Sequence, residues 1–411
     1  MSGPGDMAAR PLGARPARPV LICADRVVTG HRGQVIEDGA VLVHGTRITW
    51  VGPARSAPGS RARAAERIHL DGATLLPGLI EGHAHLCLDG GDDPFTRLAQ
   101  ASPRQVAACA RTAAERMLAK GITCVRDLGG TGGIDALIRA QVRSGQLIGP
   151  RLLSAGVPLT CPGGHCAVFG GQISTGGELA RRIGGNHRGG ATWTKIMVTG
   201  GFSTPASSPH AVQLTASQLA TAVRLSRRRG LKVAAHAHGT DGIALAAATG
   251  VDTIEHATWM REDGFDVDAA VVAELARRGI GVGVTINSRA RAARGRLPWP
   301  ERVRQLQTMR AAGVRLIAGT DCGISGTAHD DLPASLACYT DAGYRPLEVI
   351  ELATSGNARA LGLATVTGTL AAGYAADLLA VQGNPLESLA CLMRTRYVMA
   401  RGRPVPGAGS G

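Results

Sequence analysis

A regular alternation of short apolar runs and helix-like segments occupies the chain from about residue 75 onward. The runs have the near-continuous hydrophobicity of strands that are covered on both faces. Eight such strands with helices between them predict a closed parallel sheet, an α/β fold of the (β/α)8 TIM-barrel type. The runs begin at residues 74, 121, 151, 194, 232, 253, 279 and 315, and the helical segments include 103–119, 133–143, 215–229, 241–249, 266–278 and 300–312.

Strand-like sequence also flanks the barrel region on both sides, in residues 19–75 and 365–405. We predict that these strands pair in one small composite β-sandwich beside a barrel of residues 76–364. Residues 1–18 are rich in Gly, Pro, Ala and Arg and lack the apolar core of a signal peptide, so we expect a disordered tail there.

The composition limits the partners that we expect. The net charge of +14 would suit a nucleic-acid binder, whose binding would depend steeply on salt, but the arginines are scattered and no aromatic residues interleave with them. We therefore interpret the charge as solvated surface and expect no nucleic-acid partner. No run of 18 apolar residues predicts a membrane span. Nine cysteines without a CxxC pair favour free thiols and a cytoplasmic location.

Residue types that bind metals recur where the barrel strands end. Barrel enzymes keep their chemistry at this rim, and histidines two residues apart on a strand point to the same face. One such histidine alone would be an ordinary buried residue, whereas several strand ends that share one rim predict a metal site. The candidates are His83, His85, Lys195, His236, His238, His256 and Asp321.

Lys195 lies in the apolar run TKIMVTGG, although lysine is rare in this chain and arginine is common. An amine can lose its proton when it is desolvated and can then react, which a guanidinium cannot do. The alternative is a lysine whose stem packs in the strand while its ammonium reaches the strand end.

The motifs around these residues resemble the amidohydrolase superfamily, in its imidazolonepropionase-like and Xaa-dipeptidase (prolidase-like) branch. The matching text is LPGLIEGHAHL, GITCVRDLGG, GGH at 163–165, KIMVTGG, LKVAAHAHGTDGI, GVDTIEHATW, VRLIAGTDCG and AADLLAVQGNPL, within residues 40–403. The resemblance implies a barrel beside a composite β-sandwich and a centre of two divalent metal ions, usually zinc. It implies that one ion is held by His83, His85 and Asp321, the other by His236 and His256, and that a CO2-derived carbamate on Lys195 bridges them.

The same resemblance implies hydrolysis of an amide or peptide-like C–N bond by a hydroxide that the metals share, with Asp321 as general base and then acid. It places His238 near the substrate, with a ligand role for His238 as the alternative. For His165, whose Gly-rich loop follows the third strand, we expect contact with the substrate or its oxyanion, and an ordinary loop is the alternative. Glu255 is expected to point away from His256 and to be structural.

Peptide-like amides such as dipeptides and N-acyl amino acids are the leading substrates. Cyclic amides such as imidazolones are an alternative, as is a modified peptide trimmed in natural-product biosynthesis. A non-catalytic barrel relative is the alternative of a different class, and it would be expected to lose ligands that this chain keeps. The loop 202–213 contains no arginine, so it offers no candidate for binding a free carboxylate. The family often forms oligomers, so a homo-oligomer is also an expectation.

Overall fold

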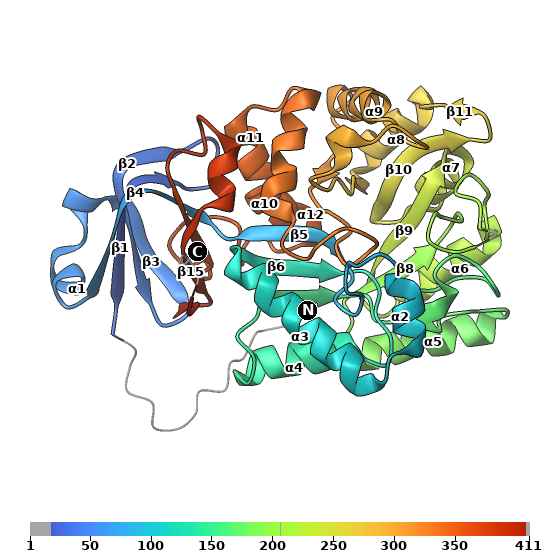
Figure 1. The fold of residues 1–411 in the computed structure, drawn as a ribbon, viewed down its shortest axis with the longest axis horizontal. Coiled ribbons are helices and arrows are strands. Elements are labelled where there is room, and N and C mark those ends of the chain that lie inside the picture. The colour runs from blue at the N-terminus through green and yellow to red at the C-terminus, as the bar shows by residue number, and fades with distance from the viewer. Residues whose placement is uncertain (1–17, 206, 408–411) are drawn as a thin grey trace.

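The computed structural model describes residues 18–407 with the exception of residue 206, so the tail expected at 1–18 lies almost entirely outside the described residues. The described chain forms two parts, a sheet built from both ends of the sequence and a barrel between them (Figure 1). Within the described residues, no helix has the length and apolar character that a membrane span requires.

The sheet has seven strands in the order β16-β15-β14-β4-β1-β2-β3. The edge strand β3 is also hydrogen-bonded to the segment that precedes β14. Ile48 N donates to Tyr374 O at 2.9 Å, and Gly373 N donates to Ile48 O at 2.9 Å. Side chains from both ends of the chain, among them Ile22, Leu75 and Leu378, fill its core. The prediction that N- and C-terminal strands pair is therefore confirmed. The strands are β1 (Val20–Val28), β2 (Val35–His44), β3 (Arg47–Pro53), β4 (Glu66–Pro77), β14 (Leu378–Gln382), β15 (Thr395–Ala400) and β16 (Arg403–Pro404).

Eight parallel strands form the barrel, as predicted. They pair in two groups, β5-β6-β7 and β8-β9-β10-β12-β13. One seam is closed where Leu159 N donates to Lys195 O at 2.8 Å, and the other where Gly82 N donates to Ala318 O at 3.0 Å. The barrel strands are β5 (Leu79–Ala84), β6 (Ile122–Asp127), β7 (Arg151–Ser154), β8 (Trp193–Met197), β9 (Lys232–Gly239), β10 (Thr253–Arg261), β12 (Gly281–Gly283) and β13 (Leu316–Ile317); β11 (Gly264–Phe265) forms a hairpin with β10.

Helices cover the outside of the barrel, and their bounds agree with the periodicity of the sequence to within a few residues. The capping box before α6 is present, since Gln218 N donates to Thr215 Oγ1 at 3.2 Å. The last barrel strand is followed by α11 and α12 with a π-helical turn between them. The helices are α1 (Gly59–Arg63), α2 (Pro94–Gln100), α3 (Pro103–Ala119), α4 (Ile134–Ser144), α5 (Gly176–Arg188), α6 (Ala216–Arg227), α7 (Thr240–Thr249), α8 (Ala269–Arg278), α9 (Trp299–Ala311), α10 (Leu332–Ser335), α11 (Pro346–Glu351) and α12 (Asn357–Leu361).

Candidate metal centre

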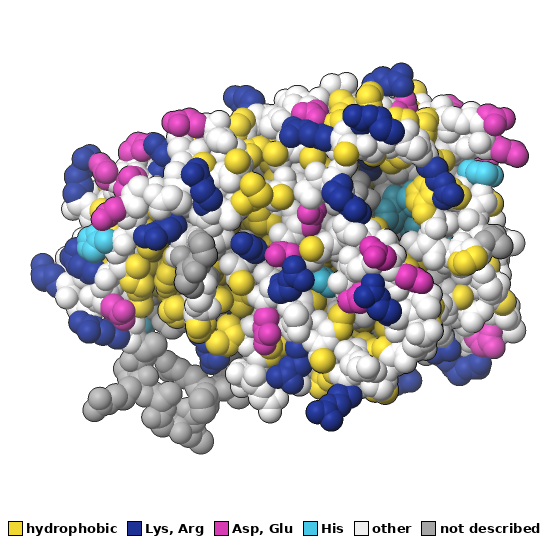
Figure 2. Space-filling model, viewed as in Figure 1, with side chains coloured by type: hydrophobic (Ala, Val, Ile, Leu, Met, Phe, Trp, Pro, Cys, Tyr) yellow, Lys and Arg dark blue, Asp and Glu magenta, His cyan; other side chains and the backbone are white. Residues whose placement is uncertain are grey.

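A cavity of about 530 Å³ opens where the barrel strands end. Histidine side chains are visible in a recess of the surface, with basic side chains at its rim (Figure 2). Every residue that the sequence proposed for the site lines this cavity: His83, His85, His165, Lys195, His236, His238, His256 and Asp321.

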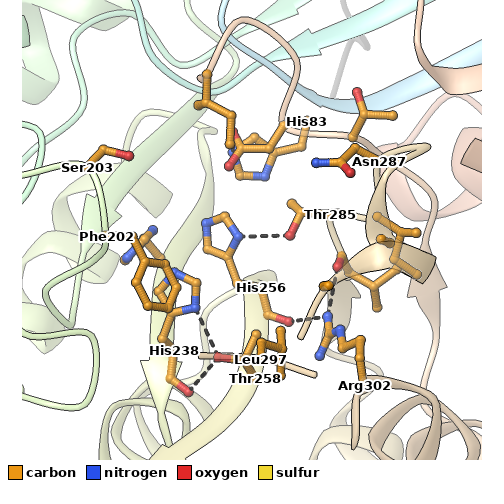
Figure 3. Close-up of a pocket in the computed structure, with 18 of the residues that line it drawn as sticks. His83, Phe202, Ser203, His238, His256, Thr258, Thr285, Asn287, Leu297 and Arg302 are labelled. Atoms are coloured by element: carbon orange, nitrogen blue, oxygen red, sulfur yellow. Dashed lines mark hydrogen bonds and ion pairs between the residues drawn. The ribbon is translucent and has the colours of Figure 1, made fainter. Parts of the chain in front are cut away.

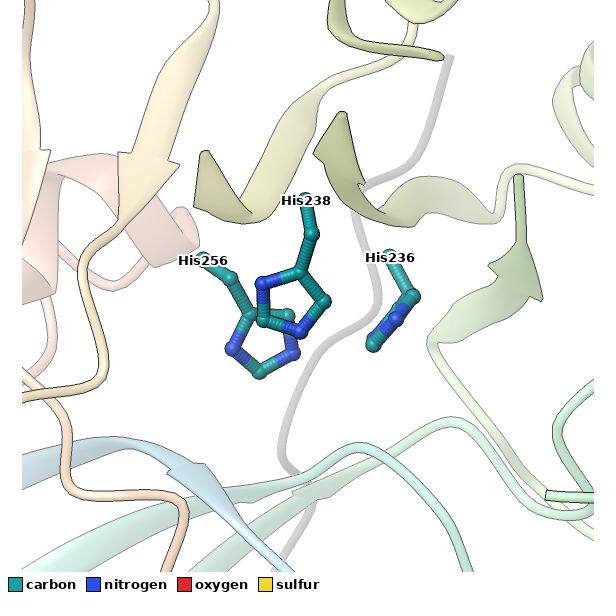
Figure 4. Close-up of side chains that lie close together, drawn as sticks. All are labelled: His236, His238 and His256. Carbon is teal, nitrogen blue, oxygen red and sulfur yellow. The ribbon is translucent and has the colours of Figure 1, made fainter. Parts of the chain in front are cut away.

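Six of the side chains in the cavity form two groups of three, and within each group the ligand atoms lie within 4.8 Å of one another. One group is His83, His85 and Asp321, from the first and last strands of the barrel. The other is His236, His238 and His256, from β9 and β10 (Figure 4). The second group contains His238 as well as the two histidines expected there, so proximity alone does not separate the ligand from its neighbour.

Two of the imidazoles are oriented by backbone carbonyls. His85 Nδ1 lies 3.0 Å from Gly129 O, and His236 Nε2 lies 3.0 Å from Gly200 O. A carbonyl only accepts, so the hydrogen must be on these nitrogens. The opposite nitrogens, Nε2 of His85 and Nδ1 of His236, therefore carry lone pairs for a metal, which is how the outer partners of metal-binding histidines fix the tautomer.

His83 is oriented by a buried ion pair. Its Nδ1 lies 3.0 Å from Glu255 Oε2, and the same carboxylate accepts from Arg126 Nη2 at 2.9 and 3.0 Å. Burial raises the pKa of Glu255, but Arg126 and His83 outweigh it and hold that pKa well below its usual range. The carboxylate fits because residue 283 is glycine: a Cβ there would lie 2.0 Å from Glu255 Oε2. His83 Nε2 is thus left to face the cavity.

Threonines orient the other two histidines (Figure 3). His238 Nδ1 lies 3.0 Å from Thr258 Oγ1, and that hydroxyl donates to His238 O at 3.3 Å, so it accepts from the ring. His256 Nδ1 lies 2.9 Å from Thr285 Oγ1. In all five imidazoles one nitrogen is bound to the protein and the other remains for a ligand.

Asp321 and Lys195 lie between the histidines without ordinary partners of their own. Asp321 Oδ1 is buried and makes no hydrogen bond within the described residues, although His85 Nε2 and His83 Nε2 approach it to 3.2 and 3.3 Å. Lys195 is fully buried, and its Nζ lies 3.4 Å from His83 Nε2. A carboxylate oxygen, an amine and several imidazole nitrogens that converge in this way fit a cation better than they fit one another.

Burial sets the charge of these groups. It lowers the pKa of His83 to about 4 and that of His238 to about 3, and it lowers the pKa values of His236 and His256 well below their usual range. Burial also acts to lower the pKa of His85, but Asp321 outweighs it and raises that pKa. Burial also lowers the pKa of Lys195. Neutral imidazoles and a neutral amine are the forms that bind metal or react with CO2.

The strand ends adopt a backbone that sequence alone did not indicate. His256 has φ 72°, Ala257 has φ 43° and Asp321 has φ 61°, values that residues other than glycine rarely adopt. The carbonyls freed at this bend within β10 are bound by the buried Arg302 of α9, whose Nη2 donates to His256 O at 2.6 Å and whose Nη1 donates to Ala257 O at 2.9 Å. Arg302 therefore stabilises the bend that presents His256.

His165 lies beside this group, with its ring centroid 4.5 Å from that of His236. Its Nδ1 lies 3.1 Å from Thr204 Oγ1, which accepts from Cys166 N at 3.0 Å. Thr204, Thr258 and Arg302 carry no local sequence signal of a role in the site, because their partners lie on other elements. Glu255 is turned away from His256, as expected, but its contact with His83 was not foreseen.

Most of the chain matches the sequence model of a known protein family. The model of the amidohydrolase family matches residues 74–405. The chain belongs to the amidohydrolase family. It is 26% identical to an ochratoxinase of Aspergillus niger over 93% of this chain and 85% of that one. It is 28% identical to an imidazolonepropionase of Caulobacter vibrioides over 84% and 87%. The crystal structure of a Xaa-Pro dipeptidase with bound methionine superposes with a TM-score of 0.83 at 26% identity, over 94% of this chain and 99% of that one.

The predicted family, fold and enzyme class are therefore confirmed: this amidohydrolase is a metal-dependent hydrolase of C–N bonds. Members of the family generally use a divalent metal site, and the two groups of side chains fit one. A small-molecule or peptide-like substrate is consistent with its relatives.

Proposed function

We propose that this amidohydrolase cleaves the amide bond of a small peptide-like substrate with two zinc ions. His83, His85 and Asp321 would hold one ion, His236 and His256 the other, and a carbamate on Lys195 would bridge them. The orientation of the histidines carries this proposal. In each of the four ligand histidines one ring nitrogen is bound to a protein atom, which leaves the other for a metal.

Asp321 acts as the general base and acid. Burial raises the pKa of Asp321, but His83 and His85 outweigh it, so the carboxylate is ionised at neutral pH. It takes a proton from the attacking water and passes it to the leaving nitrogen, which avoids release of an amide anion. When bound, the metal ions lower the pKa of water and polarise the scissile carbonyl.

His165 and His238 contact the substrate in different ways. Thr204 accepts from Cys166 N, so its own hydrogen is available for His165 Nδ1, and His165 Nε2–H can then donate to the developing oxyanion. His238 has its hydrogen on Nδ1, toward Thr258, so its Nε2 is an acceptor and suits an N–H of the substrate.

The test is a metal-loaded activity screen over dipeptides, N-acyl amino acids and cyclic amides, with metal analysis and a chelator control. We expect about two ions per chain, activity on the linear amides, and loss of activity with chelator. Turnover of cyclic amides alone would favour the imidazolone-type alternative, and unchanged turnover after metal removal would refute the proposal.

An aspartate substitution tests the role of Asp321. Asp321→Asn should lower kcat by roughly 10²–10⁴-fold, the range for loss of a general acid or base. Asp330→Asn is the matched control, because Asp330 pairs with Arg116 at 3.0 Å and does not line the cavity.

A further inference from the structure

The segment after β12 forms one wall of the cavity and is rich in arginine. It carries Arg289, Arg291, Arg294 and Arg296, and among these only Arg289 lines the cavity. The loop 202–213 contains no arginine, whereas the wall of residues 284–298 contains four.

The backbone that carries Arg289 is fixed on both sides. Asn287 Oδ1 accepts from Arg289 N at 3.1 Å, and Asn287 Nδ2 donates to Thr327 Oγ1 at 3.2 Å. Ser288 N donates to Asp331 Oδ2 at 2.7 Å, and the Ser288 hydroxyl donates to the same carboxylate. Asp331, which lies after the last barrel strand, therefore holds the arginine loop in place.

The surrounding residues also hold the guanidinium of Arg289 in a defined position. Its Nη2 donates to Ser325 O at 3.3 Å. It lies against Gly326, where a Cβ would come within 2.0 Å of Nη2 and 2.5 Å of Nη1. Gly326 has φ 65°, so a glycine is required there both by the backbone and by the close approach of the guanidinium.

Of the four arginines, only Arg291 has a counter-charge among the described residues, so what distinguishes Arg289 is that it also lines the cavity. Arg291 pairs with Asp341 at 2.7 Å, and Arg294 donates to backbone carbonyls of its own loop. Among residues 18–407 other than 206, no carboxylate lies within ion-pair distance of Arg289. Arginine has five N–H donors, and the one side-chain bond to Ser325 leaves a fork free for a planar anion.

Apolar side chains also line the cavity, and one of them, Phe202, lies beside His238 with ring centroids 4.8 Å apart (Figure 3). The others include Ala293, Leu297 and Trp299. The cavity thus combines a polar floor, apolar side chains and a guanidinium, that of Arg289, which has no carboxylate partner among the described residues.

We propose that Arg289 binds a carboxylate of the substrate and so selects amides that carry a free carboxylate beyond the scissile bond. This inference rests on the proposed function, because it names the substrate group that the same cavity recognises. Arg289 is a specificity-determining residue that takes no part in proton transfer.

The test compares N-benzoyl-L-leucine with N-benzoyl-L-leucinamide, which differ only in that the carboxylate becomes a neutral carboxamide. We expect the parent protein to prefer the carboxylate. Arg289→Met should lower kcat/KM for the carboxylate by roughly 10–100-fold, mainly through KM, and leave the carboxamide unchanged, because hydrogen bonds to a charged group are worth about 1.5–3 kcal/mol. Arg289→Lys should retain part of the preference.

Arg294→Met is the matched control, since Arg294 lies in the same loop but does not line the cavity. Binding of both compounds to Asp321→Asn protein, measured by calorimetry with and without Arg289→Met, gives a readout that does not need turnover. Equal binding and turnover of the two compounds would overturn the inference and leave the proposed function intact. Arg289-dependent binding without hydrolysis of any amide would refute the proposed function and support this inference.

Discussion

At the scale of single residues, the layer beneath the cavity is made of buried charges that satisfy one another. Arg126 and Glu255 are fully buried, and Arg126 also donates to Gly82 O at 2.7 Å and lies 4.6 Å from the ring of Trp193. Replacing one member of such a pair leaves the other charged and unpaired in the interior. Because Glu255 also holds His83, this pair connects the stability of the barrel to the candidate ligands.

We predict that Glu255→Gln weakens both metal binding and folding. Loss of the ionised acceptor for His83 should lower metal affinity roughly 10–100-fold. The unpaired Arg126 should lower the free energy of unfolding by about 3–5 kcal/mol. Metal titration and urea denaturation of the metal-free protein measure the two effects.

The double variant Arg126→Met with Glu255→Gln separates these two roles. It should recover part of the lost stability without recovering metal affinity. If the single variant bound metal as tightly as the parent, Glu255 would have no part in positioning His83.

A second residue-scale prediction concerns Lys195. Lys195→Arg keeps a cation but cannot form a carbamate, so we expect the two metal equivalents to fall to one or fewer. Lys232→Arg is the control, because Lys232 is the other lysine on a barrel strand and packs over Trp193 away from the cavity. Metal analysis and the carbonyl signal of protein equilibrated with ¹³CO2 provide the measurements. Two bound ions in Lys195→Arg would rule out the bridge.

At the scale of elements, one side-chain amide reinforces the seam between the first and last barrel strands, which the backbone bond from Gly82 N to Ala318 O also closes. Asn357 Nδ2 donates to Ile80 O at 2.7 Å and to Ala318 O at 2.8 Å, and Ala318 N donates to Asn357 Oδ1 at 3.0 Å. β5 leads to His83 and β13 leads to Asp321, so this seam holds two candidate ligands of one metal together.

We predict that Asn357→Leu lowers the free energy of unfolding by roughly 3 kcal/mol, since three buried hydrogen bonds are lost. Metal affinity should fall with it, because only the backbone bonds, such as that from Gly82 N to Ala318 O, would still hold together the two strands that carry one group of ligands. Thr215→Ala is the control: it removes the cap of α6, should cost about 1 kcal/mol, and should leave metal affinity unchanged. Urea denaturation and metal titration of both variants test this, and equal metal affinity in Asn357→Leu would contradict it.

These elements also show what the sequence could predict. Helical periodicity and the capping residues are local signals, so α3 and the start of α6 were found close to their true bounds. The candidate ligands were found because the carboxyl ends of parallel strands must meet. Asn357 could not be recognised in this way, because its partner Ile80 lies far away in the sequence. Arg302 was missed for a related reason: it binds carbonyls freed by a left-handed backbone at residues that are not glycine.

At the scale of the whole molecule, two buried carboxyls give the metal-free protein an unusual dependence on pH. Burial raises the pKa of Glu81 and of Asp127 to about 7. Both groups lose their protons near pH 4 when the chain unfolds, so between about pH 4 and pH 7 the folded state holds more protons than the unfolded state. Stability from these groups is complete below pH 4 and is lost as the pH rises to about 7.

The buried histidines His83 and His238 act in the opposite direction, because burial holds their pKa values at about 4 and 3, below the value that they take in the unfolded chain. We therefore predict that each carboxyl offsets roughly 1.4 kcal/mol per pH unit of that opposing gain between about pH 4 and pH 7. Asp127→Asn should make the metal-free protein gain more stability over this interval than the unsubstituted protein does, by roughly 1.4 kcal/mol per pH unit, because it removes one of the two opposing carboxyls. Urea denaturation of both proteins at several pH values measures the difference, and an equal dependence on pH in the two proteins would contradict the assignment.

The pairing of β4 with β14 has a consequence for how the chain is made. Leu378 lies opposite Pro77, so β4 leaves the ribosome long before its neighbour does. Until the entire barrel has been synthesised, the nascent polypeptide carries an open strand edge of the kind that invites intermolecular association. Truncated translation products that end before residue 378 are therefore expected to aggregate, and the cell would need chaperones chiefly during that interval.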